Sequence, residues 1–350
     1  MKQVHIATGQ PYKVTVGGQL AHLGEGLKEH HTPCSVMLVS DDTVNDLYGD
    51  AAEASLTAAG FKVTRFVFPH GEESKNMGTL RRLLDGLTAA GLTRTDLIVA
   101  LGGGVTGDLG GFAAAIYLRG ISYVQVPTTL LAAVDSSVGG KTGVDLPAGK
   151  NLAGAFHQPI WVLCDMNVFS TLPDETFASG MAEMIKYGVI ADEALFDALA
   201  GGDREDLASA VARCVELKGE IVAEDERDTG KRQLLNLGHT LAHAIEQRSA
   251  YAIPHGQAVA IGMAFIARAG EKAGLCEAGI AGRIAKALRA NGLPVECPYP
   301  LKELIPYLLS DKKRKGGRIT LVLPARMGAS VLHDMPLDAL ETFLAKGEEN

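Results

Sequence analysis

The sequence has little of what marks secreted, membrane-spanning or nucleic-acid-binding proteins. Its five cysteines are odd in number and form no Cys-x-x-Cys pair, so we expect reduced, mostly buried thiols rather than a disulfide framework or a thiolate zinc site. The uncharged stretch at residues 120–134 is too short to span a bilayer. No apolar signal core follows Lys2, and a net charge of -8 argues against a general binder of nucleic acid or anionic membranes. These features predict a soluble, cytoplasmic protein.

The 350 residues are enough for about two domains, each with its own core. Apolar runs typical of strands occur at residues 4–7, 13–16, 35–40, 61–68, 96–101 and 121–126, with helical patterns between them, notably at 44–59 and 79–90. This alternation predicts an α/β domain, residues 1–172, with a mainly parallel sheet and ligands beyond the carboxyl ends of its strands. After Pro173 helical patterns dominate, at residues 177–190, 194–200, 206–223, 239–247, 257–273 and 278–291, with one extended run at 318–323. Residues 173–350 are therefore predicted to form a mainly helical domain.

Two histidines, His239 and His243, stand four residues apart and would share one face of a helix. For this spacing alone, a metal pocket and hydrogen-bonded core or surface histidines are about equally good interpretations. Arg232 and Asn236 upstream, and His255 downstream, favour the metal pocket because they add a further ligand and donors for an anion. Another face of the same helix would enter a core through Leu237, Leu241, Ala244 and Ile245.

Glu183 and Lys186 lie three residues apart and would share a face of the helix around residues 181–190. Such a pair is usually a surface ion pair, but the apolar neighbours on both sides suggest that this face is buried. A buried carboxylate needs a partner, and a divalent ion shared with His239 and His255 would supply one. Catalytic zinc sites use such a ligand set and keep positions open.

Gly102, Gly104 and Gly107 satisfy the G-x-G-x-x-G pattern after a predicted strand and at the start of a helix. Glycines there let backbone N–H groups approach a pyrophosphate at the helix N-terminus, so we expect phosphate binding; a merely close-packed turn is the alternative. Asp108, just inside the helix, is either a partner of the helix dipole or a ligand contact. The next strand runs into Pro127, so the ribose-reading acid of an ordinary Rossmann unit is not at its usual place. Upstream candidates for that acid are Asp41, Asp42 and Glu72.

The segment 135–151 is rich in glycine, lysine and hydroxyl groups, which predicts a loop with a role in binding. Its Gly-Gly-Lys-Thr, residues 139–142, resembles part of a P-loop, but the spacing requires a glycine where Asp135 stands, and no strand immediately precedes it. The two lysines of this segment and Asn151 suit a phosphorylated or carboxylated small molecule better.

In their order along the chain, these motifs resemble those of the 3-dehydroquinate synthase family of the shikimate pathway. The residues that carry the resemblance are 102–108, 127–129, 135–143, 149–151, 183–187, 236–240 continuing to His243, 255–256 and the basic run 311–313. They cover nearly the whole chain. The resemblance implies an NAD-binding α/β domain followed by a helical metal-binding domain, usually in a homodimer.

The resemblance also implies roles by matching position. Zn²⁺ or Co²⁺ would be held by Glu183, His239 and His255. NAD would lie against Gly71, Glu72, Glu73, Ser74, Lys75, Gly104, Val105, Thr106, Gly107, Asp108, Thr128, Thr129, Lys141, Lys150, Phe169, Ser170 and Thr171. The substrate would be surrounded by Asp135, Lys141, Asn151, Lys186, Lys218, Arg232, Asn236, His243 and one of Lys312 or Lys313. Arg119 is expected to reach the phosphate site of the neighbouring subunit.

The activity implied is conversion of 3-deoxy-D-arabino-heptulosonate 7-phosphate into 3-dehydroquinate and phosphate. NAD would oxidise one ring hydroxyl transiently and be regenerated in each turnover, with the metal polarising that oxygen. One rival is another sugar-phosphate cyclase, such as a 2-epi-5-epi-valiolone or 2-deoxy-scyllo-inosose synthase, which would differ in the carboxylate pocket. A second is a metal-dependent polyol dehydrogenase, which would consume NAD stoichiometrically. A non-catalytic protein on this fold is the third, and the complete set of metal ligands argues against it.

Overall fold

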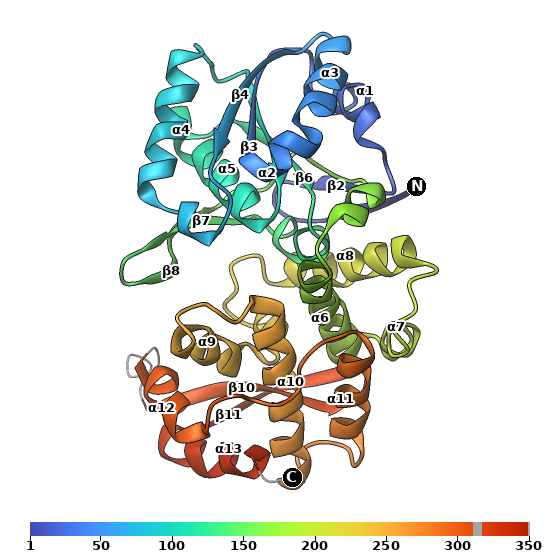
Figure 1. Ribbon diagram of the computed structural model, residues 1–350, viewed down its shortest axis with the longest axis vertical. Helices are drawn as coiled ribbons and strands as arrows, with labels where there is room; N and C mark the ends of the chain where they lie inside the picture. Colours follow the sequence, from blue (N-terminus) through green and yellow to red (C-terminus); the bar gives the residue numbers. More distant parts are fainter. Residues whose placement is uncertain (311–316, 349–350) are drawn as a thin grey trace. The chain divides into compact units, whose positions relative to one another are not determined.

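The computed structural model describes residues 1–310 and 317–348, and its chain divides into two compact units (Figure 1). One unit comprises Met1–Leu172 and Val211–Arg227, and the other Pro173–Ala210 and Asp228–Asn350. The sequence assigned the helix at residues 206–223 to the second domain, but most of that helix belongs to the first unit by its contacts. Across the described part of the chain, none of the helices has both the length and the apolar character needed to cross a bilayer.

The first unit is built on a seven-stranded sheet with the strand order β1-β2-β9-β6-β5-β3-β4. Only β1 and β2 pair antiparallel; every other neighbouring pair is parallel. The mainly parallel sheet predicted from the sequence is therefore confirmed, with β9 as a strand that the sequence analysis did not identify. The strands are β1 (Lys2–Ile6), β2 (Tyr12–Val16), β3 (Ser35–Asp41), β4 (Lys62–Phe68), β5 (Leu97–Gly102), β6 (Ser122–Pro127) and β9 (Trp161–Cys164).

Helices cover both faces of this sheet, as Figure 1 shows. The helices α1 (Leu23–Lys28) and α3 (Asp50–Ala58) pack on one face, and α4 (Met77–Ala89) and α5 (Gly104–Ile116) on the other. Successive residues of β3 alternate between the two cores, because side chains of a strand point to opposite faces. Val36 and Leu38 join the first core, and Met37 and Val39 the second. A strand buried on both faces reads as a continuous apolar run, which is why the sequence predicted it well.

The segment expected to be a loop at residues 135–151 instead contains most of an antiparallel hairpin, β7 (Lys141–Leu146) and β8 (Gly149–Phe156). Two glycines, Gly143 and Gly154, face each other across this hairpin. A Cβ added to Gly154 would lie 2.2 Å from the carbonyl oxygen of Thr142, so the strands approach more closely than side chains would permit. These glycines therefore serve strand packing, and the glycine content that suggested a loop was misleading here.

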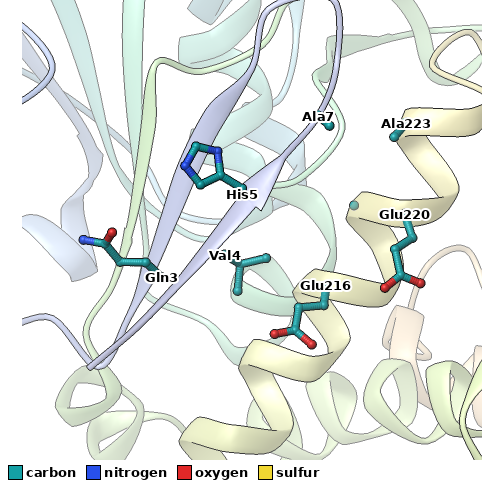
Figure 2. A pocket seen from close by; sticks show the side chains of 8 residues that line it. Gln3, Val4, His5, Ala7, Glu216, Glu220 and Ala223 are labelled. Atoms are coloured by element: carbon teal, nitrogen blue, oxygen red, sulfur yellow. The ribbon is translucent and has the colours of Figure 1, made fainter.

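The first unit also includes most of α8 (Leu207–Glu224), which lies beside β1. Gly219 permits this approach, since a Cβ there would lie 2.7 Å from Cδ1 of Ile6. Glu216 and Glu220 of α8 and His5 of β1 line an open hollow of about 300 Å³ between the two elements (Figure 2). None of the site residues predicted from the sequence lines it.

The second unit is mainly helical, as predicted, and is organised around α10 (His255–Lys272), whose residues from Gly256 to Gly270 are nearly all buried. The helices α6 (Asp174–Ala191), α9 (His239–Arg248), α11 (Ile280–Ala290) and α13 (Leu340–Glu348) pack against it. The unit also contains α7 (Glu193–Leu199), α12 (Leu301–Ser310) and the hairpin of β10 (Arg318–Arg326) and β11 (Ala329–Pro336). The strand β10 was predicted from the sequence, whereas β11, α12 and α13 were not.

Candidate active site

Three side chains that are far apart in the sequence meet in the second unit. Glu183 comes from the middle of α6, His239 is the first residue of α9, and His255 is the first residue of α10. Oε1 of Glu183 lies 3.7 Å from Nε2 of His239 and 3.7 Å from Nε2 of His255. One ligand atom from each residue lies within 4.8 Å of the other two. The structure thus brings together the three residues proposed as metal ligands.

Close backbone contacts fix where these residues lie. Gly238, which precedes His239, has φ +80°, a conformation that glycine adopts without strain. A Cβ on Gly262 of α10 would lie 2.2 Å from the carbonyl oxygen of Gly238, so α9 begins directly against α10. A Cβ on Gly256 would lie 2.3 Å from Cα of Ser179, which presses the start of α10 onto α6. Glycine at these contacts lets the three ligand-bearing helices converge.

The residues present suit a divalent metal ion. Two imidazole nitrogens and one carboxylate oxygen form the protein part of a catalytic zinc site, with positions left for water or substrate. Donors at zinc bonding distance in a tetrahedron lie about 3.4 Å apart, slightly less than the 3.7 Å observed here. Nδ1 of His239 lies 3.1 Å from the carbonyl oxygen of Leu237, which leaves Nε2 with its lone pair toward Glu183.

Burial sets the electrostatics of this cluster. Glu183 and Lys186 are 0% and 1% exposed and form an ion pair, so the pair predicted from its spacing is a buried one. Burial, together with the charge of Lys186, lowers the pKa of His239 to about 3. Burial also opposes the charged form of His255, but the carboxylates of Glu183 and Glu246 raise its pKa to about 10. A metal bound through His255 would therefore displace a proton from it.

Further polar residues of the same unit lie on α9 or on the turn that precedes it. The ring of His243 lies 5.7 Å from that of His239, nearly perpendicular to it, and His243 is exposed. The 3₁₀ turn Lys231–Asn236 leads into α9 and carries Arg232, which is 2% exposed. Asn236, at the end of that turn, is exposed. Lys312 and Lys313 lie outside the described residues.

Most of the proposed nucleotide residues lie in the first unit after the carboxyl ends of parallel strands. They lie in or beside the 3₁₀ turn Glu72–Ser74 after β4, at the start of α5 after β5, at Thr128 and Thr129 after β6, and in the 3₁₀ turn Met166–Thr171 after β9. The exceptions are Lys141 and Lys150, which lie on the hairpin of β7 and β8. The chain order reverses between β3 and β5, which are neighbours in the sheet, and nucleotides bind at such switch points. The glycine pattern begins at the end of β5, beside this position.

The glycines of that pattern also pack α5 against the sheet. A Cβ on Gly102 would lie 2.3 Å from Oγ1 of Thr106, and a Cβ on Gly107 would lie 2.4 Å from Oε1 of Gln125. The close-packed turn, which was the alternative interpretation to a phosphate site, is present, and phosphate binding by this turn stays a prediction. Two of the three acids suggested as ribose contacts already accept hydrogen bonds from backbone N–H groups. Asp41 accepts one from Val44, and Asp42 accepts one from His70.

Lys75 connects three of the predicted segments. It is 5% exposed, and its Nζ lies 2.6 Å from Oδ2 of Asp108 and 2.6 Å from Oδ1 of Asn151. Burial opposes the ammonium form, but the carboxylates of Asp108 and Glu72 raise the pKa of Lys75 above its ordinary range, so it stays charged. Lys150 lies 3.7 Å from Glu72. The hairpin of β7 and β8 is thereby joined to the turn after β4 and to the start of α5.

A second buried lysine of the first unit, Lys218 of α8, donates to the carbonyl oxygen of Asp135 at 2.5 Å and to its Oδ1 at 2.7 Å. This pair joins two residues that the family resemblance assigns to the substrate site. Lys141, at the start of β7, is exposed. Arg119 is exposed and has φ +72°, and Leu118 before it has φ +51°, so Arg119 is presented by a strained turn.

Comparison with known proteins assigns the chain to a family. The model of the 3-dehydroquinate synthase N-terminal region matches residues 65–179, and that of the C-terminal region matches residues 180–314. The chain belongs to the 3-dehydroquinate synthase family. The family, the enzyme class and the fold predicted from the sequence are therefore confirmed.

Curated members of the 3-dehydroquinate synthase family resemble this chain over nearly its whole length. The 3-dehydroquinate synthase of Caulobacter vibrioides is 49% identical and covers 89% of this chain and 88% of its own. That of Streptococcus gordonii is 44% identical and covers 96% of this chain and 97% of its own. The similarity thus extends over both units.

Solved structures of other sugar-phosphate cyclases share the fold of this 3-dehydroquinate synthase family member. A 2-deoxy-scyllo-inosose synthase complexed with carbaglucose-6-phosphate, NAD⁺ and Co²⁺ has a TM-score of 0.87 at 26% identity, covering 98% of this chain and 99% of its own. The 2-epi-5-epi-valiolone synthase of Streptomyces hygroscopicus with NAD⁺ and Zn²⁺ has a TM-score of 0.86 at 28% identity, covering 96% of each chain. An iron-containing alcohol dehydrogenase, at 17% identity and a TM-score of 0.66, shares only the fold.

One buried carboxylate near the metal ligands was missed by the sequence analysis. Glu246 is 4% exposed and lies on α9, seven residues after His239. Residues seven apart share a helix face, so its spacing from His239 was the available signal. Glu246 was not assigned a role from the sequence, because acidic residues on helices are ordinarily exposed to solvent.

Proposed function

We propose that this chain converts 3-deoxy-D-arabino-heptulosonate 7-phosphate into 3-dehydroquinate and phosphate, using a divalent metal and NAD that is regenerated in each turnover. The observation that carries this proposal is the convergence of Glu183, His239 and His255. The identities of 44% and 49% to named 3-dehydroquinate synthases favour this substrate over those of the other cyclases, whose structures are 26% and 28% identical.

In the second unit, we assign metal binding to Glu183, His239 and His255. A bound divalent ion would supply Lewis acidity at a substrate oxygen. The neighbouring side chains are suited to the negative charges of the substrate, because cations held in fixed positions neutralise and orient phosphate and carboxylate groups. We propose this role for Lys186, Arg232, Asn236 and His243, and also for Lys313, which lies outside the described residues.

Lys186 and Arg232 are the cations best placed for this task in the second unit. Each is at most 2% exposed, so each loses little further contact with water when an anion binds. A charge interaction of this kind is strongest where water is excluded. His243 and Asn236 are exposed and can donate or accept at a hydroxyl of the substrate.

In the first unit, we propose that the turns after β4, β5, β6 and β9 bind NAD. The first turn of α5 offers backbone N–H groups to the pyrophosphate, and Lys75 holds Asp108 and Asn151 in place by direct contacts. Asp135, Lys141, Asn151 and Lys218 are proposed as substrate residues. The NAD-binding residues of this proposal are Gly71, Glu72, Glu73, Ser74, Lys75, Gly104, Val105, Thr106, Gly107, Asp108, Thr128, Thr129, Lys141, Lys150, Phe169, Ser170 and Thr171.

Assembly as a homodimer is part of the proposal, with Arg119 of each subunit binding the substrate phosphate of its neighbour. Its exposure and its position in a strained turn support this role, because backbone strain persists where function requires it. We also propose a cytoplasmic location. The assignment of NAD binding to residues 1–172 and metal binding to residues 173–350 stays a proposal, with most of α8 moved to the first unit.

The proposal is tested by supplying the heptulosonate phosphate to the zinc-loaded protein with NAD at a small fraction of the substrate concentration. We expect many phosphate ions released per NAD, with no lasting rise in NADH absorbance, because the hydride returns within each turnover. Accumulation of NADH in proportion to product would identify a dehydrogenase instead. Equal turnover of a substrate analogue that lacks the carboxylate would favour another sugar-phosphate cyclase.

A further inference from the structure

The side chain of Glu246 lies behind one of the metal ligands. Its Oε1 is 3.4 Å from Nδ1 of His255, while Nε2 of the same imidazole is 3.7 Å from Oε1 of Glu183. The ring of His255 is therefore held between two carboxylates, one on the metal side and one on the far side. Glu246 is 4% exposed, and a carboxylate buried to this degree costs free energy unless it is paired.

The two imidazoles of the cluster are oriented in the same way. His239 has an acceptor at Nδ1, the carbonyl oxygen of Leu237, and directs Nε2 toward Glu183. His255 has the Glu246 carboxylate at Nδ1 and also directs Nε2 toward Glu183. An acceptor at Nδ1 fixes the tautomer and the ring plane of a metal-ligating histidine. A charged acceptor additionally makes the imidazole a stronger donor.

The backbone around Glu246 supports the same contact. Its carbonyl oxygen accepts bonds from the backbone N–H of Tyr251 at 2.7 Å and from the hydroxyl of Ser249 at 3.0 Å. Ala250 and Tyr251 have φ of +50° and +64°, a conformation that costs non-glycine residues free energy. This strained turn reverses the chain between α9 and α10 and brings His255 back against Glu246.

We propose that Glu246 is a positioning residue of the metal centre. It accepts the Nδ1–H of His255, keeps Nε2 directed at the ion, and strengthens the imidazole as a ligand. The inference rests on the metal centre of the proposed function, since it concerns how one of its ligands is held. A purely structural role, in which Glu246 only satisfies a buried histidine, predicts a loss of folding stability without a loss of metal affinity.

The test measures zinc affinity on the full chain by competition with a chromophoric chelator, for the wild type, Glu246→Gln and Glu246→Ala. We expect Glu246→Gln to bind zinc about 10-fold more weakly and Glu246→Ala about 100-fold more weakly, as for other supporting carboxylates. The glutamine retains an acceptor oxygen but loses the charge, so it should rescue part of the loss. Gln247→Ala, an exposed neighbour on α9, is the matched control and should leave the affinity unchanged.

Two further measurements separate the outcomes. The visible spectrum of the cobalt-loaded protein should change in Glu246→Gln, because the geometry or strength of one nitrogen ligand changes. Urea unfolding of the metal-free variants reports any structural cost separately. Unchanged zinc affinity and an unchanged cobalt spectrum in folded Glu246→Gln would overturn the inference while leaving the metal centre intact. Failure of the wild type to bind one ion would instead remove the metal centre of the proposed function.

Discussion

The ammonium group of Lys75 lies 2.6 Å from the carboxylate of Asp108, although the two residues belong to different sequence motifs. One follows β4 and the other lies near the start of α5, so their ion pair fixes the two sides of the proposed nucleotide site relative to each other. Lys75 is 5% exposed, and removing its partner leaves a buried positive charge poorly compensated.

The first prediction concerns this pair. Asp108→Ala should lower the free energy of unfolding by about 2–3 kcal/mol, somewhat less than for a fully buried pair, because the carboxylate is partly exposed. The double variant Lys75→Met/Asp108→Ala should lose less than the sum of the two single variants, since it leaves no unpaired charge. Urea unfolding measures all four proteins, and strictly additive losses would show that the two side chains are not coupled.

A second prediction concerns the close contact between α9 and α10. Gly262→Ala should lower the free energy of unfolding by about 1–3 kcal/mol, because its Cβ would meet the backbone oxygen of Gly238. It should also weaken zinc binding, because Gly238 immediately precedes His239. Gly282→Ala is the control, since its Cβ would meet nothing within 4 Å and alanine favours a helix by up to about 1 kcal/mol. Equal effects of the two substitutions would contradict the role given to this contact.

The third prediction concerns pH and Asp96. This buried carboxylate accepts bonds from Thr93 N at 2.6 Å, Thr93 Oγ1 at 2.7 Å and Ser35 N at 2.8 Å. Burial works to raise the pKa of Asp96, but these bonds outweigh it and hold the pKa below its ordinary value. A depressed pKa in the folded state contributes stability that is present above the ordinary pKa of about 4 and is lost as the pH falls below it.

Asp96→Asn should therefore destabilise the protein by about 1–3 kcal/mol at pH 7, because an amide N–H₂ replaces an acceptor that faces N–H and O–H donors. The difference from the wild type should shrink as the pH falls from about 4 to 3, where the wild-type carboxylate begins to gain a proton. Urea unfolding at pH 7 and at pH 3 makes the comparison. A difference that stays constant over this range would show that Asp96 does not titrate with a depressed pKa.

Much of the fold could be predicted from the sequence, because strands that are buried on both faces have continuously apolar sequences. The run that became β3 reads as continuously apolar, and the glycine pattern after β5 marks the start of α5. The packing of α8 in the first unit could not be predicted from the sequence. An amphipathic pattern indicates that a helix has an apolar face, but not which core that face packs against. The hairpin of β7 and β8 was not predicted, because a segment rich in glycine is ordinarily interpreted as a loop. Here Gly143 and Gly154 instead allow a close contact between two strands.

The site could be predicted where motifs are specific and not where packing decides. The spacing of Glu183 from Lys186, and of His239 from His243, gave the helix faces, and the family resemblance supplied the ligand set. The contact of Glu246 with His255 depends on how a strained turn reverses the chain, which no local pattern encodes. The same holds for Lys218 and Asp135, whose pairing depends on where α8 packs.

The fourth prediction tests the proposed role of Arg119 in the neighbouring subunit. Arg119→Ala and His239→Ala should each be nearly inactive as homodimers, the first through weak phosphate binding and the second through loss of a metal ligand. A mixed dimer would contain one site with intact His239 from one subunit and intact Arg119 from the other. Mixing the two proteins under conditions of subunit exchange should therefore restore up to about a quarter of the wild-type activity per total subunit, since about half of the dimers are mixed and each has one complete site.

If Arg119 instead served its own subunit, every site of the mixed dimer would lack either Arg119 or His239, and no activity would be restored. The Arg119→Lys variant is the control for charge, and we expect it to recover part of the phosphate affinity but not all of it, because lysine lacks the planar fork of arginine. Absence of restored activity in a verified mixed dimer would place Arg119 outside the neighbouring site.

The central claim is that Glu183, His239 and His255 hold one divalent ion, and anomalous scattering from zinc-loaded crystals tests it most directly. The account predicts a single strong peak about 2.0–2.2 Å from Nε2 of His239, Nε2 of His255 and a carboxylate oxygen of Glu183. A peak held by other side chains, or none at these three in protein shown to contain zinc, would contradict it.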